Sequence, residues 1–290
     1  MSVGPHDVVA KTNEKIRKDR RRQLKRRALL SFAVVSVLIG AVSFIAYRPH
    51  ARVQTVAVLG TETLSVYDIE EIVHDRIDGA FVYLFPRNTV FFINKHALEK
   101  DIVQTYPRVE TIDISIEKQE LRILIQERKA SYLWCGSVPF AEIVDERPCY
   151  YFDKSGFIFD SAPYFSASVY FTLYDEVEAS GEADPIGHYV SHHEGMESLL
   201  SFVASLEPLD IRGFALALTD TEATLYLGNT KDIHAPKVIW RIDGNYATLG
   251  SNLQSALGVE PMKSEALGGD KELDYIDLRY SDKVYYKLKN

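Results

Sequence analysis

The chain has 290 residues, a formal net charge of −8 at pH 7 and a composition that is 46% hydrophobic. That length suffices for two modest domains, and the acidic balance argues against a role in binding nucleic acid. Only two cysteines are present and they do not form a C-x-x-C pair, which excludes a thioredoxin-like redox site.

The chain begins with a basic tail followed by an uncharged stretch. Residues 1–27 hold ten Lys or Arg and three acidic residues, a balance of +7 that leaves −15 on the rest of the chain. Residues 28–47 carry no charge over 20 residues, and at about 1.5 Å per residue they span roughly 30 Å of hydrocarbon. This pattern predicts a single-pass protein of the cell membrane, with a cytoplasmic tail that contacts anionic lipid and with the bulk of the chain outside. A secretory signal peptide is the competing interpretation, but residues 47–50 do not resemble a small-residue cleavage site.

Residues 51–128 are predicted to form a small α/β unit. Ser65 is placed as the N-cap of a helix that Gly79 ends, and Asn94 as the N-cap of a second helix that Pro107 ends. Two runs with period-2 alternation follow, joined by a tight turn. The predicted order is β-α-β-α-β-β, with a strand at 53–60, a helix at 66–79, an extended aromatic stretch at 81–93, a helix at 95–107, and strands at 109–118 and 120–128.

Residues 129–290 are predicted to form a mostly antiparallel, β-rich domain with two helices. Short runs of aromatic and β-branched residues are separated by turn residues, and residues 153–156 mark a hairpin turn between aromatic flanks. Apolar stripes at helical spacing predict the two helices at 194–208 and 245–258. The fold class as a whole is therefore α+β, with one N-terminal transmembrane helix.

The two cysteines, Cys135 and Cys149, both lie in this second domain. They flank a hairpin-like stretch with apolar or aromatic residues beyond each of them. In an oxidising compartment a disulfide that closes this loop of about 15 residues would contribute roughly 3 kcal/mol. We expect the disulfide, and two free thiols are the alternative.

No pattern in the sequence indicates catalysis or a cofactor. His188, His192 and His193 lie near Glu194, but their spacing matches no helical zinc motif such as H-E-x-x-H, and an exposed polar loop is the preferred interpretation. Patterned carboxylate pairs, G-x-S-x-G, S-x-x-K and Gly-rich phosphate loops are absent from the sequence. We therefore expect a protein that is not an enzyme and that needs neither cofactor nor metal.

Three stretches of the chain resemble the bacterial cell-division family FtsQ/DivIB. VQTVAVLGTETLSVYDIEEIV resembles the family's opening strand and helix, within a unit that has the element order of a POTRA domain. YPRVETIDISIEKQELRILIQERKASYLW is similar to the family's P-x-V, paired-strand and E-R signature. CYYFDKSGFIFD and the closing LDYIDLRYSDKVYYKL resemble its aromatic-Asp-x-x-Gly hairpin and its D-L-R-Y strand. The cysteine-flanked insertion and the bulky residues after D-L-R-Y depart from the family pattern.

The resemblance implies a scaffold of the division septum. Members of the family bind other single-span division proteins, chiefly FtsB/DivIC-like and FtsL-like partners, and so help to control the peptidoglycan synthases. It also implies a POTRA domain at 51–128, associated with recruitment, and a β domain at 129–290 whose end binds the FtsB-type partner.

The last predicted strand, residues 273–288, is the expected partner-binding element. Its even positions from Ile276 are mostly apolar and its odd positions mostly polar or aromatic, which predicts one strand with one buried face. As the last element it could lie at a sheet edge, exposed and idle, but with the resemblance the preferred interpretation is that it accepts a partner strand. The expected partner-binding residues are Arg279, Tyr280, Ser281, Lys283, Tyr285 and Lys287.

Two other functional classes remain as alternatives. A membrane-anchored cell-envelope enzyme or wall-binding protein would need a nucleophile or an acid pair that converges in a cleft. A POTRA protein of an outer-membrane assembly system would need a transmembrane barrel, and the short strands here lack its repeated lipid-facing alternation.

Overall fold

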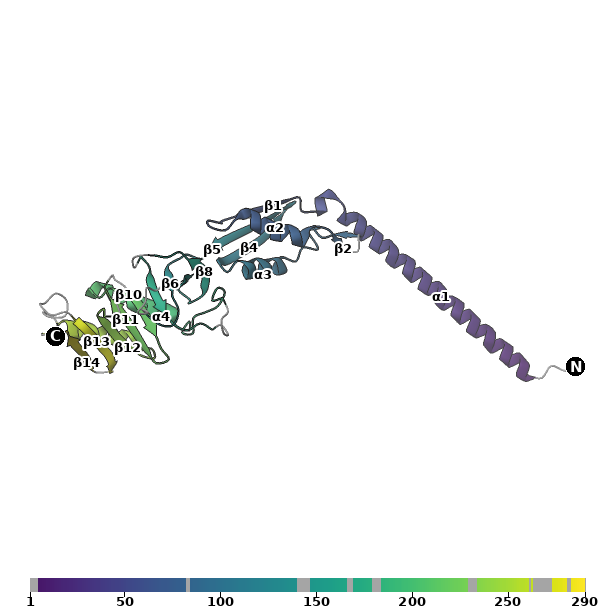
Figure 1. Cartoon of the computed structure of the whole chain (residues 1–290). Coiled ribbons are helices and arrows are strands. Elements are labelled where there is room, and N and C mark those ends of the chain that lie inside the picture. The colour runs from purple at the N-terminus through teal and green to yellow at the C-terminus, as the bar shows by residue number, and fades with distance from the viewer. Residues whose placement is uncertain are drawn as a thin grey trace. The chain divides into compact units, whose positions relative to one another are not determined.

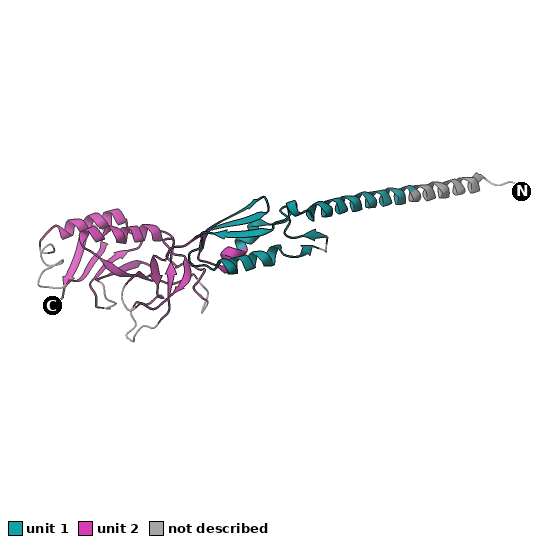
Figure 2. Cartoon of the chain, turned by 90° about the horizontal axis from the view of Figure 1, so that it is seen from above, with its two compact units in different colours: residues 1–100, 112–125 teal, residues 101–111, 126–290 magenta. Residues whose placement is uncertain are grey.

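The structure, a computed structural model, describes residues 5–81, 84–139, 147–165, 169–178, 184–228, 234–260, 262, 273–280 and 283–289. The chain divides into two compact units (Figure 2). The first unit contains residues 1–100 and 112–125, and the second contains residues 101–111 and 126–290. Residues 101–111, which precede the sequence boundary expected after residue 128, thus cluster with the second unit.

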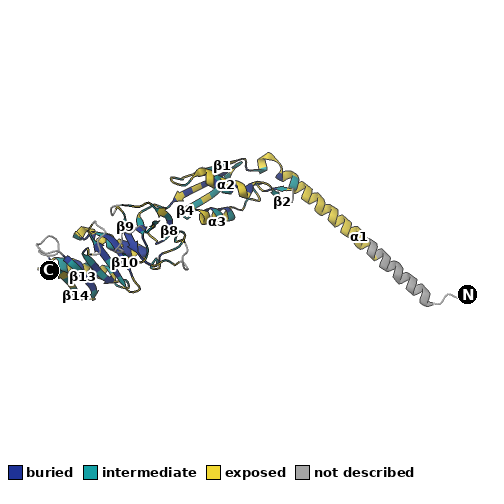
Figure 3. Cartoon of the chain, viewed as in Figure 1, coloured by how far each residue is buried: buried dark blue, intermediate teal, exposed yellow. Residues whose placement is uncertain are grey.

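The first unit begins with a long helix, α1 (Pro5–Ala46), shown in purple in Figure 1. Its segment Gln23–Ala46 is long and apolar enough to cross a membrane. The large apolar side chains of this segment are exposed, as the yellow ribbon in Figure 3 shows. The apolar stretch is the one in which the sequence predicts a membrane span, and α1 continues into it from the basic tail without a break. A short 3-10 helix, η1 (Pro49–Ala51), follows.

A three-stranded sheet in the order β1-β5-β4 follows, and most of its residues belong to the first unit. The N-caps form as the sequence predicts: Ser65 Oγ accepts a hydrogen bond from the Asp68 N–H, and Asn94 Oδ1 accepts one from the Ala97 N–H. Gly60, at the end of β1, has a φ of +86°, and a Cβ there would lie 2.2 Å from the Ile125 carbonyl oxygen. The elements are β1 (Thr55–Leu59), α2 (Val66–Ile77), α3 (Lys95–Thr105), β4 (Val109–Glu117) and β5 (Glu120–Glu127).

The aromatic stretch at 81–93 does not supply a strand to this sheet. It forms part of a separate two-stranded hairpin of β2 (Ala80–Phe81) and β3 (Phe85–Pro86). The chain folds back on itself here, because the Leu84 N–H donates to the Phe81 carbonyl and the Arg87 N–H to the Gly79 carbonyl. Pro86 has no N–H to donate to a longer ladder. The extended element expected between the two helices is therefore present as this short hairpin, outside the three-stranded sheet.

The second unit is built on a nine-stranded sheet in the order β14-β13-β12-β11-β10-β9-β6-β7-β8. Five of its eight neighbouring pairs are antiparallel, and the pairs β13–β12, β10–β9 and β9–β6 are parallel. The strands are β6 (Tyr132–Trp134), β7 (Cys149–Phe152), β8 (Ile158–Ala162), β9 (Phe171–Tyr174), β10 (Gly213–Leu218), β11 (Glu222–Leu227), β12 (Lys237–Arg241), β13 (Leu273–Tyr280) and β14 (Lys283–Leu288).

Helices α4 (Met196–Ser205) and α5 (Tyr246–Leu257) cover one face of this sheet and lie in the segments predicted as helical. Phe202 of α4 meets the buried Trp240 edge to face, with ring centroids 5.3 Å apart, inside the main core. The 3-10 helix η2 (Glu207–Leu209) follows α4. A smaller core on other sheet residues contains Tyr174, Phe214 and Tyr226. Cys135 and Cys149 are joined by a disulfide, which connects the end of β6 to the start of β7.

The arginines of the P-x-V and E-R signatures have a common structural role in the second unit. Arg108 Nε donates to Asp160 Oδ2 at 2.8 Å, and Arg128 forms an ion pair with Asp153. Asp153 begins the turn of the D-x-x-G hairpin, and Asp160 lies in its second strand, β8. The arginines of the P-x-V and E-R signatures therefore pair with the aspartates of the hairpin, so that these stretches of the sequence neutralise each other's charges.

Candidate functional site

The closing stretch of the chain forms a hairpin at one edge of the large sheet. Strands β13 and β14 pair antiparallel, and β13 also pairs parallel with β12. The expectation of one strand over residues 273–288 is therefore wrong: β13 lies inside the sheet and β14 is the edge strand. Within the part of the chain that the structure describes, no strand pairs with the outer side of β14.

A β-bulge explains why the alternation in the sequence does not reveal that two strands are present. If the pairing of Tyr280 with Lys283 continued without a shift, odd positions of β14 would lie opposite even positions of β13. The register shifts between Asp277 and Tyr280, so that Ile276 pairs with Tyr286 and Asp277 with Tyr285. The extra residue restores the parity, so that the even positions Ile276 and Leu278 of β13 and those of β14 face the core, whereas Tyr280 lies beyond the bulge and is exposed. One period-2 pattern therefore runs through two strands.

The exposed surface of the hairpin carries a pair of tyrosines. Tyr280 is 52% exposed and Tyr285 is 48% exposed. Their rings meet edge to face with centroids 5.1 Å apart. Two exposed aromatic rings that support each other form the kind of rigid amphipathic contact that protein interfaces favour. The sequence placed both among the partner-binding residues, although it assigned Tyr280 to the inward-facing even positions, from which the bulge removes it.

Arg279, expected to bind a partner, forms its hydrogen bonds with carboxylates of its own chain. Its Nε and Nη2 atoms donate to the two carboxylate oxygens of Asp277, at 2.9 and 2.6 Å, and its Nη1 donates to Glu222 Oε1 at 2.8 Å. These bonds join β13 to β11 across the outer face of the sheet. Arg279 therefore orders the sheet surface near the hairpin, and its guanidinium charge is compensated within this chain.

The hydrogen bonds of this network lower the pKa of the Asp277 carboxyl group. The residue is only 5% exposed, and burial by itself would raise the pKa of its carboxyl group. Hydrogen bonds from Arg279 outweigh the desolvation and hold the pKa below its usual value. The hydrogen bonds to Asp277 and Glu222 likewise raise the pKa of Arg279. Both groups remain charged at neutral pH.

The remaining expected residues lie on or beside β14. Lys287 Nζ donates to Asp274 Oδ2 at 2.8 Å, which lowers the pKa of the Asp274 carboxyl group. Lys283 is exposed at the start of the strand, whereas Ser281 lies outside the described residues. On the opposite face, partly buried side chains attach β14 to the main core: Val284, Tyr286 and Leu288. The strand is thus anchored on one face and presents polar and aromatic groups on the other.

A buried carboxylate pairs with one of the histidines of the polar segment at 188–194. Asp175 Oδ1 lies 2.7 Å from His192 Nδ1, and its Oδ2 accepts the His192 N–H at 3.0 Å. The pair borders a cavity of about 580 Å³ that Ser137, Thr219 and Thr221 also line. The sequence reasoning missed Asp175, since nothing in the run FTLYD distinguishes an aspartate that will be buried. Among the described residues no group of three or more His, Cys, Asp or Glu is placed to hold a metal ion.

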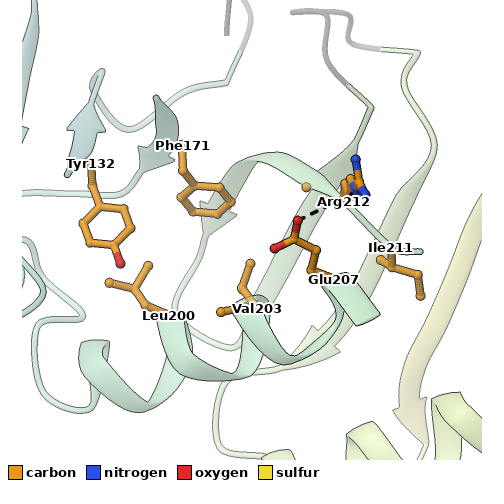
Figure 4. A pocket seen from close by; sticks show the side chains of 9 residues that line it. Tyr132, Phe171, Leu200, Val203, Glu207, Ile211 and Arg212 are labelled. Carbon is orange, nitrogen blue, oxygen red and sulfur yellow. Dashed lines mark ion pairs between the residues drawn. The ribbon is translucent and has the colours of Figure 1, made fainter. Parts of the chain in front are cut away.

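A second, more apolar cavity of about 330 Å³ lies at the end of α4 (Figure 4). The rings of Tyr132 and Phe171 face Leu200 and Val203 across it, and an ion pair of 3.9 Å between Glu207 and Arg212 borders it. Because its walls carry few polar groups, this cavity lacks the convergent chemistry of a catalytic site.

Fold and site together define an α+β protein with an N-terminal apolar helix and a large mixed sheet, in which β14 is the edge strand among the residues that the structure describes. The feature best suited to a function is that strand and its tyrosine pair. Comparison of the sequence with protein-family models and with curated proteins finds no match.

Proposed function

We propose that this protein is a non-catalytic, single-pass scaffold of the bacterial division septum, of the FtsQ/DivIB type. The apolar helix α1 anchors it in the cytoplasmic membrane, with the basic tail inside and the chain from Arg48 onward outside. Its partners are FtsB/DivIC-like and FtsL-like single-span proteins, and through them it influences the septal peptidoglycan synthases.

Three features support the anchoring and the family. The segment Gln23–Ala46 has the length and composition of a membrane span. The disulfide between Cys135 and Cys149 suits an oxidising, extracytoplasmic compartment. Residues 51–128 have the order β1-α2-β2-β3-α3-β4-β5, in which the separate β2–β3 hairpin stands where the POTRA order β-α-β-α-β-β has its second strand.

The observation that carries the binding proposal is the position of β14 at the edge of the nine-stranded sheet. A strand from the partner adds beside β14, and backbone hydrogen bonds across this edge supply affinity. Tyr280 and Tyr285 supply specificity as exposed aromatic anchors. Lys283 adds a positive charge, which favours a partner segment that carries acidic residues.

The test is a binding measurement with the full chain in nanodiscs and the extracytoplasmic segments of the host's FtsB-like and FtsL-like proteins. The double substitution Tyr280→Ala and Tyr285→Ala is expected to weaken binding by about 2–4 kcal/mol, roughly 30- to 1,000-fold. Tyr164→Ala is the matched control, because this tyrosine is exposed in the same unit but lies outside the hairpin. Equal loss in the control variant would move the site elsewhere, and no binding by the wild type would refute the scaffold.

The Asp175–His192 pair favours a second candidate, a membrane-anchored cell-envelope hydrolase with His192 as general base. In such an enzyme the buried Asp175 would orient the imidazole toward a substrate in the adjoining cavity. Incubation of the purified chain with peptidoglycan fragments tests this. Turnover that His192→Ala abolishes, while partner binding persists, would establish the enzyme.

A further inference from the structure

The outer end of α1 is attached to the β2–β3 hairpin. Ser43 Oγ donates to the Leu84 carbonyl oxygen at 2.6 Å, and Thr89 Oγ1 lies 3.4 Å from the Ala46 carbonyl oxygen. Ser43 and Ala46 are three residues apart and so share one face of the helix. Ala46 is buried, whereas Phe44 and Ile45 on other faces are exposed. One face of the last helical turn thus contacts the first unit.

These contacts place the hairpin at a definite depth relative to the apolar helix. The uncharged run ends at Tyr47, four residues after Ser43. At about 1.5 Å per residue, Ser43 lies roughly 6 Å below the outer end of that run. The backbone of Leu84, which Ser43 contacts, therefore lies level with the final turn of the apolar segment and not above it.

The same region exposes several large apolar side chains. Leu84 is 45% exposed and Phe91 is 78% exposed, and the aromatic rings of Phe81 and Phe92 are also exposed. An apolar cluster of this kind on a soluble surface is typical of a contact site. The guanidinium of Arg87 lies over the ring of Phe81, 5.0 Å from its centroid. Exposed Phe and Leu side chains next to a basic residue are typical of protein surfaces that enter the membrane–water interface.

We propose that this surface, defined here as the membrane-facing patch of Phe81, Leu84, Arg87, Phe91 and Phe92, inserts into the outer lipid–water interface of the bilayer that α1 spans. The inference rests on the anchoring proposed above. The occupant is the lipid surface, because the patch is continuous with the apolar helix through the Ser43–Leu84 and Thr89–Ala46 contacts. Arg87 then lies at the level of the lipid phosphates.

The consequence is a second attachment point for the first unit. With the helix as the only membrane attachment, the first unit could tilt and rotate together with α1 in the bilayer. A patch that also enters the interface restricts the tilt and rotation of this unit relative to the membrane plane.

The test measures the depth of spin labels in the full chain reconstituted alone in phosphatidylethanolamine–phosphatidylglycerol nanodiscs. Cysteines at Leu84→Cys and Phe91→Cys carry the labels, since both native cysteines are engaged in the disulfide. Leu124→Cys is the matched control, an exposed leucine (56%) in the same unit. It lies four residues along β5 from Glu120, the partner of Thr55, and so about 13 Å from that end of the sheet. Val35→Cys, within α1, reports whether the helix spans the bilayer.

The measured quantity is the ratio of label accessibility to oxygen and to a water-soluble nickel chelate. We expect this ratio to be several-fold higher at positions 84 and 91 than at 124, with Val35 in the hydrocarbon. Ratios at 84 and 91 equal to that at 124, with Val35 in the hydrocarbon, would overturn the patch while the anchor stands. An aqueous ratio at Val35 would overturn the anchor and the patch together.

Discussion

The two edges of the large sheet are protected to different degrees. At one edge, β8 is covered by a loop, because the Ile158 N–H donates to the His188 carbonyl at 2.9 Å and the Gly187 N–H to the Ile158 carbonyl at 2.8 Å. Arg108 adds an ion pair with Asp160 on the same strand. At the other edge, β14 has no such cover among the described residues.

Among the described residues, the fold thus covers the edge strand at one end of the sheet and not at the other. An unpaired strand invites association with other chains, and proteins usually block it with loops, charges or prolines. The edge at β14 has lysines but also two exposed tyrosines. Tyrosines do not prevent the pairing of another strand as charges and prolines do, and they are common anchor residues of protein interfaces. The following changes test each side of this contrast, in order of decreasing effect.

The largest effect is expected inside the hairpin. Ile276 of β13 is fully buried in the main core, whereas Val284 of β14 is only partly buried. Ile276→Ala should reduce the free energy of unfolding by about 2–4 kcal/mol, because it removes buried methyl groups and leaves a cavity. Val284→Ala should cost less than half as much. Urea denaturation of both variants measures this, and equal losses would mean that β14 is as deeply embedded as β13.

The disulfide lies in the half of the sheet that ends at β8. The double substitution Cys135→Ser and Cys149→Ser releases a link with a sequence separation of 14 residues. The free energy of unfolding should fall by about 3 kcal/mol, with partner binding at β14 unchanged. A denaturation curve and a binding isotherm on the same sample check both statements. Lost binding in a folded variant would show that the two ends of the sheet are coupled.

A smaller effect is expected from the ion pair that protects β8. Arg108 is mostly buried and bonds Asp160 while its guanidinium lies 5.4 Å from the centroid of the Phe159 ring. Arg108→Gln should lower the free energy of unfolding by about 1–2 kcal/mol. The control is Arg241→Gln, whose partner Asp243 is exposed, and it should leave stability unchanged. If both variants behave alike, the ion pair at β8 does not protect the strand.

The smallest effect concerns the network beside β14. Desolvation opposes ionisation of Asp277, but the hydrogen bonds from Arg279 hold its folded pKa below the unfolded value of about 3.9. Its ionised form therefore stabilises the fold above about pH 4, and that contribution disappears as the pH falls through the folded pKa. The stability difference between wild type and Asp277→Asn should shrink below about pH 4. Thermal unfolding from pH 7 to pH 2 measures it, and a constant difference would contradict the assignment.

The features that could be predicted from the sequence depend on local patterns of residues. The uncharged run before Tyr47, the caps at Ser65 and Asn94, and the turn at 153–156 each depend on a few neighbouring residues, and the structure has α1, α2, α3 and the β7–β8 turn at those places. Element type follows from such short-range preferences because capping, turn geometry and periodicity act within a few residues.

The features that only the tertiary structure decided depend on pairing between distant segments. A bulge lets one alternating pattern run through both β13 and β14, so periodicity could not reveal which residues lie at the edge. Arg279 looked like a binding residue because its partner Glu222 is 57 residues away. The open edge itself is a property of strand order, and strand order is set by which apolar faces can be buried together, which no local pattern encodes.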